Sequence, residues 1–368
     1  MSTSNSSRVE ATWQLLQQWH TDGHCRAISA ETGNLVDEAH SFTIGQLAAD
    51  DQTPVTSDSI FLIASPTKPL VATAAMMLVE QGQLQLDHLV SRYLEGFQNK
   101  DKQAIRIHHL LTHTSGLPDM LPNNAELRAA HAPLSEFMKH VCEVPLVARP
   151  GTRVHYQSMG ILTLAAIIEK IAGSSLPEYL SQTIFAPLQM TSTSLGIAED
   201  WPSSGHMDRM TWSQVDDKPE ATDWGWNSQY WRRLAAPWGG LLSTAADLGR
   251  FCRHLLGIHA GESGIIAPMT LRAMTTNQLV HLPELPTEVV GTTPWGLGWQ
   301  LNWPAHPRGF GSLLPIDSYG HWGATGTMLW IDPDRGVYGV VLTTEPVEME
   351  NRRQIAFGNM SSLIWTRD

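Results

Sequence analysis

The sequence predicts an α/β fold of the α+β type, in which strands from both ends of the chain build one sheet and the middle forms a mostly helical lobe. The spacing of apolar side chains changes twice along the 368 residues, which supports this division. Strand-like runs lie before residue 64 and return after residue 295, whereas the residues between them show mainly helical spacing of apolar side chains. Strands at both termini therefore favour one sheet packed against an inserted helical lobe.

The N-terminal segment supplies the first part of this sheet. We expect a helix, a β-hairpin and a short strand there: residues 9–20, strands at 25–30 and 35–44 around a turn at 31–34, and residues 60–63. Residues 70–82 are apolar on almost every face, which predicts a helix buried in the interior.

The helical lobe and the second half of the sheet follow. The expected helices of the lobe are residues 105–113, 134–144, 159–172, 176–184 and 243–256. Strands are expected at 296–303, 327–331 and 337–343, before a last helix at 351–365. We therefore assign residues 1–82 and 290–368 to a sheet domain and residues 83–289 to the lobe.

Residues 201–238 are rich in Trp, Asp, Ser and Gly, and they contain six of the 14 tryptophans. Their weak periodicity predicts long loops, and the acidic pair Asp216-Asp217 is expected to be solvated. Tryptophan offers a large apolar face and one N–H donor. The stretch can therefore line an acyl-binding pocket or cap the helical lobe, and the sequence leaves both roles open.

The composition argues against several classes of partner. The formal net charge is −12, from 24 Lys and Arg against 36 Asp and Glu, and no basic cluster suggests nucleic acid or an anionic membrane. Cys25, Cys142 and Cys252 are too scattered for a disulfide framework, which favours a reducing compartment. The N-terminus lacks the apolar core of a signal peptide, so we expect a cytoplasmic protein; its oligomeric state stays open.

The first chemical signal is Ser65-Pro66-Thr67-Lys68, at the start of the predicted buried helix. Ser65 lies at the mouth of this helix, and Lys68 shares its face because it is three residues further along. An amine beside a hydroxyl can help to make that hydroxyl a nucleophile. A serine followed by proline is also typical of an ordinary helix N-cap, so these four residues alone leave both interpretations open.

Further motifs follow in a fixed order. They are Leu110-Leu111-Thr112-His113-Thr114-Ser115-Gly116-Leu117-Pro118, Arg149-Pro150-Gly151-Thr152, Tyr156-Gln157-Ser158-Met159-Gly160, Gly239-Gly240-Leu241-Leu242-Ser243-Thr244-Ala245-Ala246-Asp247-Leu248 and Gly320-His321-Trp322-Gly323-Ala324-Thr325-Gly326. Together with the Ser-x-x-Lys stretch, the series resembles the serine β-lactamase-related hydrolases, which include class C β-lactamases, family VIII carboxylesterases and DD-peptidases. The resemblance covers about residues 60–344 and implies a β-lactamase/transpeptidase-like fold with an antiparallel sheet flanked by helices.

The resemblance also implies a set of roles. Ser65 would be the nucleophile that forms an acyl-enzyme, and Lys68 would hold the proton-transfer network together. Tyr156 would be the general base toward Ser65 and then the acid toward the leaving group, with the Lys68 ammonium favouring its phenolate. The N–H groups of Ser65 and Ala324 would form the oxyanion hole. The alternative for Tyr156 is a wall residue whose hydroxyl is satisfied locally.

Two positions depart from the pattern of the family. Ser158 stands where Tyr-x-Asn is frequent, and His321-Trp322-Gly323 stands where the β-lactamases have Lys-Thr-Gly. An imidazole is mostly neutral at pH 7 and regains its charge near pH 6.5, so His321 would bind a lactam carboxylate less well than lysine. Both changes favour an ester over a penicillin.

We therefore expect a serine hydrolase that acts on a small-molecule ester or amide, most simply a carboxylesterase. A β-lactamase, a D-amino-acid peptidase and an acyltransferase share the same acyl-enzyme and stay open, and a non-catalytic binding protein is a remote alternative. No cofactor is expected, because the chain has neither a P-loop nor a G-x-G-x-x-G motif. No metal is expected either, since His108, His109 and His113 have no further ligand placed beside them.

Overall fold

The computed structural model describes residues 3–36, 38–99, 101–215, 223–303, 309–347 and 353–366. Its main sheet has six strands in the order β2-β1-β9-β8-β7-β6, and every neighbouring pair is antiparallel. The strands are β1 (Ala27–Asn34), β2 (Ala39–Gly45), β6 (Gln300–Leu301), β7 (Tyr319–Trp322), β8 (Met328–Asp332) and β9 (Val337–Thr343). The predicted antiparallel sheet built from both ends of the chain is confirmed.

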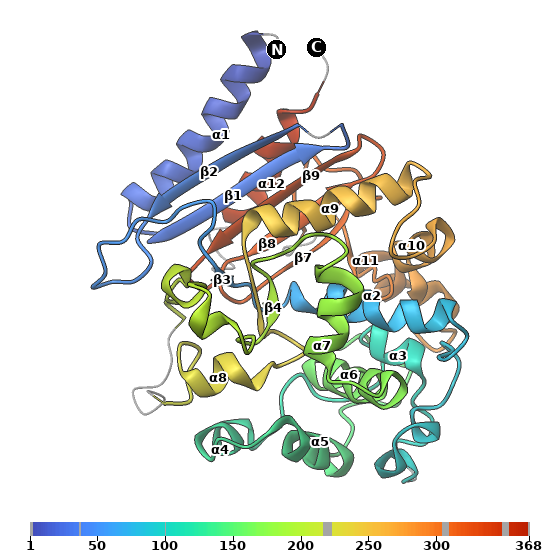
Figure 1. Cartoon of the computed structure of the whole chain (residues 1–368). Helices are drawn as coiled ribbons and strands as arrows, with labels where there is room; N and C mark the ends of the chain where they lie inside the picture. Colours follow the sequence, from blue (N-terminus) through green and yellow to red (C-terminus); the bar gives the residue numbers. More distant parts are fainter. Residues whose placement is uncertain are drawn as a thin grey trace.

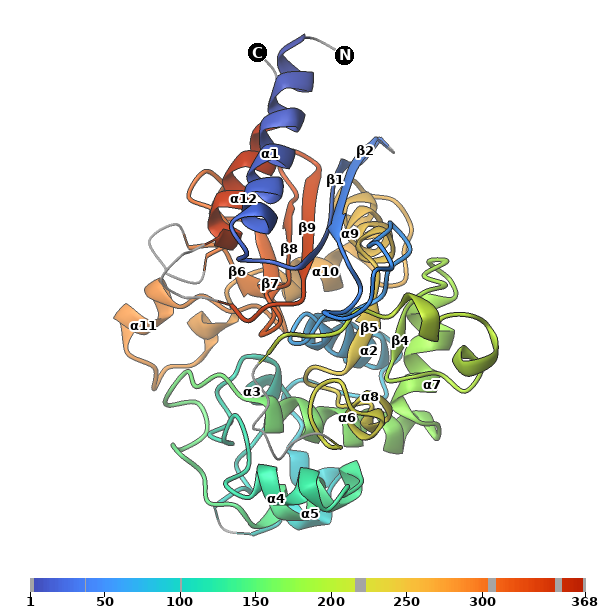
Figure 2. The same ribbon diagram turned by 90° about the vertical axis from the view of Figure 1, so that its left-hand side faces the viewer.

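The two ends of the chain meet at the β1–β9 pair. Their register runs from Ile28 opposite Thr343 to Asn34 opposite Val337. All residues of β9 are buried, because helices cover both faces of the sheet. Figure 2 shows α1 (Thr3–Thr21) and α12 (Arg353–Leu363) on one side of the sheet and α9 (Ala245–His259) on the other. Residues 351 and 352, where the last helix was expected to begin, lie outside the described residues.

The predicted turn at residues 31–34 is wrong, because these residues belong to β1 and the chain turns after them. Glu31 is held inside the sheet, where the Tyr338 hydroxyl donates a 2.6 Å hydrogen bond to its carboxylate. The Asn34 side chain opens the turn instead, because its oxygen accepts from the backbone N–H groups of Val36 and Glu38. The expected turn ended at Asn34, whereas the observed turn begins there.

Helix α2 (Thr67–Glu80) is buried where the sheet domain meets the lobe (Figure 1). Its neighbours in the lobe include α6 and α7. The other α-helices of the described residues are α3 (Ile107–Leu111), α4 (Asn124–Ala129), α5 (Leu134–Glu143), α6 (Ser158–Ala172), α7 (Leu176–Leu180), α8 (Gln229–Leu234), α10 (Pro268–Met274) and α11 (Thr287–Thr292). The domain boundaries stay a prediction; α9, inside the range 83–289, packs against β1 and β9.

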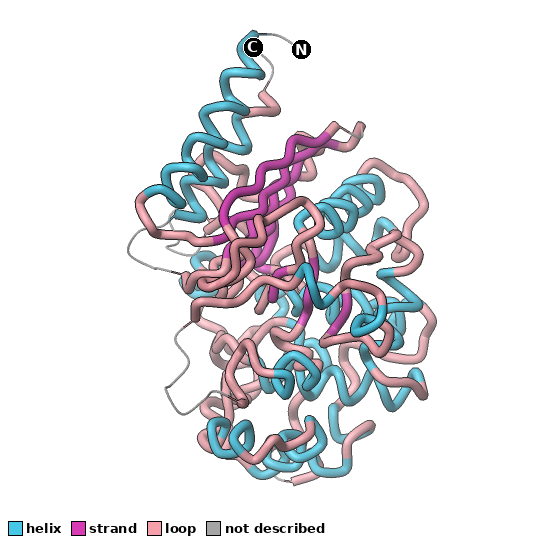
Figure 3. Tube along the Cα trace, turned by 60° about the vertical axis from the view of Figure 1, so that its left-hand side comes forward, coloured by secondary structure: helices cyan, strands magenta, loops and turns pink. Residues whose placement is uncertain are grey.

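A second, small sheet leads into α2. It has the order β3-β5-β4 and consists of Phe61–Leu62, Leu241–Ser243 and Ser194–Leu195. The strand expected at 60–63 therefore belongs to this sheet and not to the main one. Figure 3 shows the strands gathered in one part of the molecule, with helices and loops forming the rest.

The strand expected at 296–303 is reduced to β6. Gly298 adopts a φ of +80°, which turns the chain, and its N–H donates to the Leu111 carbonyl oxygen. A Cβ at Gly298 would overlap Ala72 of α2, so this turn lies directly against the buried helix.

Among the described residues, no single helix has both the length and the hydropathy of a membrane span. Helix α6 and the following segment Leu176–Phe185 reach that hydropathy only as a pair, and they are bent by 75° at the break between them.

Candidate active site

Ser65 lies between the end of β3 and the start of α2. Ala64 adopts a φ of +54°, in the left-handed region that a non-glycine residue rarely occupies, and this reverses the chain just before Ser65. Pro66 is the N-cap residue of α2, so the N-cap role considered for Ser65 does not apply. The Ser65 hydroxyl instead accepts a hydrogen bond of 3.0 Å from Lys68 Nζ.

Lys68 is a buried amine in the first turn of α2, with 1% of its surface exposed. Its Nζ also donates to the Trp238 carbonyl oxygen at 2.7 Å and lies 4.7 Å from the centre of the Tyr156 ring. Burial lowers the pKa of Lys68 to about 7, and the negative charge of Asp119 opposes this shift. An amine of this pKa can exchange protons near neutral pH.

Tyr156 stands two residues before α6, in a cluster of rings. Its ring centre lies 4.7 Å from that of His113, 6.0 Å from that of Trp295 and 6.0 Å from that of His321. The next residue, Gln157, is buried and fixes this segment, because its amide donates to the His109 carbonyl oxygen and its amide oxygen accepts from the Ser115 hydroxyl. The Leu110–Pro118 motif therefore positions Tyr156 through Gln157.

The two buried imidazoles of this cluster have opposite tautomers. His321 Nδ1 lies 2.8 Å from the Trp322 carbonyl oxygen, which can only accept, so Nδ1 carries the proton. His113 Nδ1 accepts from the Gln157 N–H at 3.2 Å, so the proton of its neutral ring is on Nε2. Burial, followed by the nearby Lys68 charge, lowers the pKa of His321 to about 3 and that of His113 well below its usual value. Both rings are neutral at pH 7.

This result corrects one expectation for His321. The sequence predicts that its positive charge returns near pH 6.5, the ordinary pKa of the side chain. The ring is fully buried, and a charge there would lose its hydration beside Lys68, so the pKa falls to about 3 instead. Burial is a property of the fold that the motif does not reveal.

The turn after β7 places Gly323 against Ile63 and Pro66, which lie just before and just after Ala64-Ser65 in the sequence. The Thr325 and Thr327 hydroxyls donate to the carbonyl oxygens of Leu62 and Ile63, at 2.8 and 2.6 Å. These bonds join the turn to the segment that leads to Ser65. Among the hydrogen bonds of the described residues, none uses the N–H of Ser65 or of Ala324, and the oxyanion hole stays a prediction.

Gly323 allows this contact, and we expect Gly323→Ala to disrupt it. A Cβ at this position would overlap the Ile63 carbonyl oxygen and lie 2.8 Å from Pro66 Cδ, so the turn must move away from Ser65. Overpacking of this kind costs about 1–3 kcal/mol of unfolding free energy, and a shift of about 1 Å costs about 10²-fold in rate. Thermal unfolding and kcat measure both effects. Gly291→Ala is the matched control, because a Cβ there meets open space; equal results for the two variants would contradict the prediction.

Ser158 is bound by Asp119, a residue outside the motifs of the sequence. Its backbone N–H and its hydroxyl both donate to Asp119 Oδ1, at 2.9 and 2.7 Å. Asp119 directly follows the Leu110–Pro118 motif in the sequence. That position was the available signal, but only the fold shows that the carboxylate lies beside Ser158.

The tryptophan-rich stretch mostly packs into the lobe. Trp201, Trp224, Trp231 and Trp238 are each at most 8% exposed, whereas Trp212 is 51% exposed. The buried Arg128 guanidinium lies 5.0 Å from the Trp224 ring centre and 4.4 Å from that of Trp231. These four tryptophans therefore belong to the packed interior, and the last of them supplies the carbonyl that binds Lys68, so lining a pocket and capping the lobe both stay predictions for the stretch. Asp216 and Asp217 lie outside the described residues.

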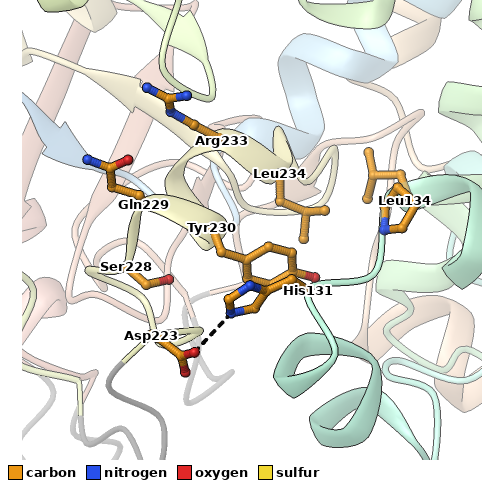
Figure 4. Close-up of a pocket in the computed structure, with 9 residues that line it drawn as sticks. His131, Leu134, Asp223, Ser228, Gln229, Tyr230, Arg233 and Leu234 are labelled. Atoms are coloured by element: carbon orange, nitrogen blue, oxygen red, sulfur yellow. Dashed lines mark ion pairs between the residues drawn. The ribbon is translucent and has the colours of Figure 1, made fainter.

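A separate hollow of about 750 Å³ lies beside α8 (Figure 4). The His131 ring stacks on Tyr230 there, with ring centres 4.8 Å apart, and His131 Nε2 lies 3.2 Å from the Asp223 carboxylate. None of Ser65, Lys68 and Tyr156 lines this hollow.

The histidines in and after α3 contact different residues and do not share one site. His109 Nδ1 accepts from the Arg106 N–H at 3.2 Å, while His113 packs against Tyr156 and Trp295. Among the residues that the structure describes, no three His, Cys, Asp or Glu side chains are grouped as metal ligands.

Known proteins resemble this chain in sequence. The sequence model of the β-lactamase family matches residues 26–359. Penicillin-binding protein 4 of Amycolatopsis lactamdurans is 30% identical over 346 residues, which make up 90% of this chain and 84% of that protein.

Solved structures agree in fold and, at these identities, establish the fold alone. EstCE1, a hydrolase with promiscuous acyltransferase activity, superposes with a TM-score of 0.78 at 19% identity and covers 99% of this chain and 100% of its own. A penicillin-binding protein homologue from Caulobacter crescentus gives 0.76 at 20% identity, with 97% of each chain covered. With the family match over most of its length, this chain belongs to the β-lactamase family of serine β-lactamase and penicillin-binding-protein-like hydrolases.

Proposed function

We propose that this chain is a carboxylesterase that cleaves small esters through an acyl-enzyme on Ser65. The observation that carries the proposal is the buried Lys68 amine, which donates to the Ser65 hydroxyl at 3.0 Å and faces the Tyr156 ring. With a pKa of about 7, Lys68 can share one proton with Tyr156 near neutral pH.

The proposed first step transfers the proton of the Ser65 hydroxyl to the Tyr156 phenolate, whose charge the Lys68 ammonium stabilises. The Ser65 oxygen then attacks the ester carbonyl carbon, and the electron pair of the C=O bond moves to the carbonyl oxygen. The N–H groups of Ser65 and Ala324 stabilise the resulting oxyanion. When the intermediate collapses, the C–O bond to the leaving alcohol breaks, and Tyr156 returns the proton to that alcohol.

The second step releases the acid. Tyr156 accepts a proton from a water molecule, which attacks the acyl carbon and forms a second tetrahedral intermediate. Collapse of this intermediate breaks the bond to Ser65 Oγ and returns the proton to the serine. The two steps are chemically symmetrical, so one Ser-Lys-Tyr set serves both.

The charges around the site support a neutral ester over a lactam. His321, at the position of the lysine in Lys-Thr-Gly, is fully buried and has a pKa of about 3, so it offers no cation to a substrate carboxylate. Ser158, at the position of the asparagine in Tyr-x-Asn, already donates its hydroxyl to Asp119. Neither residue supplies the contact that a penicillin requires at its position.

The test compares p-nitrophenyl butyrate with nitrocefin. A charge-assisted hydrogen bond contributes about 1.5–3 kcal/mol, and each 1.4 kcal/mol is about tenfold, so we expect kcat/KM for the ester to be at least about tenfold higher. Because the pKa of His321 is about 3, the ratio should not change in favour of nitrocefin between pH 7.5 and pH 5.5. Equal efficiency on both substrates at pH 7.5 would replace the esterase proposal with a β-lactamase.

A peptidase is the second candidate, because the 30% identical relative is named a penicillin-binding protein. D-alanyl peptides carry a terminal carboxylate, which would meet the same lack of a cation at His321. Release of D-alanine from such a peptide at a rate above ester cleavage would favour this candidate. Transfer of the butyryl group to an added alcohol, measured in the same assay, tests acyl transfer.

A further inference from the structure

Asp119 connects the segment that carries Tyr156 to the loop that follows α3. Ser158, the first residue of α6, donates to Asp119 Oδ1 through its N–H at 2.9 Å and its hydroxyl at 2.7 Å. The Asp119 carboxylate thus acts at the N-terminus of a 15-residue helix, where a negative charge and an acceptor oxygen are both favourable. Tyr156 is only two residues away, on the same short segment.

The same two segments are also joined at their other end. The His155 N–H donates to the His113 carbonyl oxygen at 2.8 Å, and the Gln157 N–H donates to His113 Nδ1 at 3.2 Å. The segment around Tyr156 is therefore held at His113 on one side and at Asp119 on the other. The Ser158 N–H also donates to the Asp119 backbone carbonyl oxygen at 3.2 Å, so loss of the carboxylate would weaken the bond to this N–H and leave the Ser158 hydroxyl without its acceptor.

The charge of Asp119 has a second effect, on Lys68. The groups that face Lys68 are Tyr156, the buried rings of His113 and His321, and Asp119. Both imidazoles are neutral at pH 7, and among the described residues Asp119 is the carboxylate whose charge acts on Lys68. Within the same residues, no Lys or Arg lies within ion-pair distance of Asp119, so its charge is not neutralised by a closer cation.

We propose that Asp119 is a positioning residue of this active site: its carboxylate fixes the start of α6 and with it the segment that carries Tyr156, and its negative charge acts on the Lys68 ammonium. This inference rests on the proposed Ser-Lys-Tyr mechanism. The simpler interpretation is that Asp119 only caps α6, in which case its charge would not matter to the reaction.

Two substitutions separate position from charge. Asp119→Asn keeps an acceptor oxygen for Ser158 and removes the charge, whereas Asp119→Ala removes both. Ser158→Ala removes one of the two hydrogen bonds and keeps the charge. Asp119→Asn is therefore expected to fold like the wild type, with a nearly unchanged unfolding temperature.

The main readout is the pH dependence of kcat/KM for p-nitrophenyl butyrate. Activity should rise as the Lys68–Tyr156 pair loses its first proton, near pH 7. The Asp119 charge raises the pKa of Lys68 against the effect of burial, so its removal in Asp119→Asn should move the midpoint to lower pH. Asp119→Ala should in addition lower kcat by about tenfold or more with a small change in KM, because Tyr156 is less well placed. Ser158→Ala should lower kcat without moving the midpoint.

An NMR titration measures Lys68 without any substrate. The protein is labelled with ¹³Cε-lysine, and the Lys68 signal is assigned by its absence from Lys68→Ala. Asp119→Asn should lower its titration midpoint. An unchanged midpoint in Asp119→Asn overturns the charge role, and a wild-type kcat in Asp119→Ala overturns the positioning role. If the wild type cleaves no ester, the proposed function fails, while the titration still decides the effect of Asp119 on Lys68.

Discussion

Replacement of Ser65 by alanine is expected to lower kcat/KM for p-nitrophenyl butyrate by at least about 10⁴-fold, because nucleophile variants of serine hydrolases lose activity on this scale. The protein should remain folded. The Ser65 hydroxyl accepts one hydrogen bond, from Lys68 Nζ at 3.0 Å, and the loss of one such bond costs about 0.5–1.5 kcal/mol. Activity assays and a thermal unfolding curve measure the two quantities separately.

A fluorophosphonate probe identifies the nucleophile independently. The probe should label wild-type protein at Ser65 and leave Ser65→Ala unlabelled, as read by peptide mass spectrometry. Ser204→Ala is the control, because this exposed serine lies in the turn after the 3₁₀ helix Trp201–Ser203, where its hydroxyl contacts His206 and not Lys68. A label on any other serine, or an active Ser65→Ala variant, would remove Ser65 from the mechanism.

Strands buried on both faces could be predicted closely from the sequence. β9 (Val337–Thr343) has the predicted limits, because its apolar run ends at clear turn residues. β1 could not be delimited in this way, since Glu31 and Thr32 look like turn residues but are buried and hydrogen-bonded to the hydroxyl and the backbone of Tyr338. Their partner is about 300 residues away, and no local pattern contains it.

In the candidate site, too, residues in local motifs could be predicted and contacts between distant residues could not. Ser65, Lys68 and Tyr156 could be selected because each lies in a motif with recognisable spacing, and the structure brings these three side chains together. Trp238 contributes its backbone carbonyl to Lys68 from 170 residues away, so its residue type carries no signal. Asp119 acts through its position beside Ser158, which depends on how the loop after α3 packs against α6.

Electrostatic properties were the least predictable part of the site. The charge of a histidine depends on burial and on neighbouring charges as much as on its own pKa. From the sequence, His321 is expected to have the ordinary histidine pKa near 6.5, yet its ring is fully buried beside Lys68 and its pKa is lowered to about 3. For Lys68 the buried position could be expected from the apolar helix around it, and the lowered pKa agrees with that expectation.

Replacement of Tyr156 by phenylalanine should lower kcat by about 10²–10⁴-fold, the usual contribution of a positioned acid–base group. The ring would keep its packing, 4.7 Å from His113 and 6.0 Å from Trp295 between ring centres, so stability should change little. Tyr230→Phe is the matched control. It also removes one tyrosine hydroxyl, which donates to the Ala132 carbonyl oxygen, but it lies beside the separate hollow.

Lys68→Ala distinguishes the two possible bases. It should be at least as damaging as Tyr156→Phe, because it removes the cation that stabilises the phenolate and leaves the buried Trp238 carbonyl without this donor. Steady-state and single-turnover kinetics on p-nitrophenyl butyrate should therefore show slow acylation in both variants, with intact ester binding. A Tyr156→Phe enzyme with nearly normal kcat, beside an inactive Lys68→Ala enzyme, would assign proton transfer to Lys68 itself. In that case the lowered pKa of Lys68, about 7, would make its neutral amine the base that accepts the Ser65 proton.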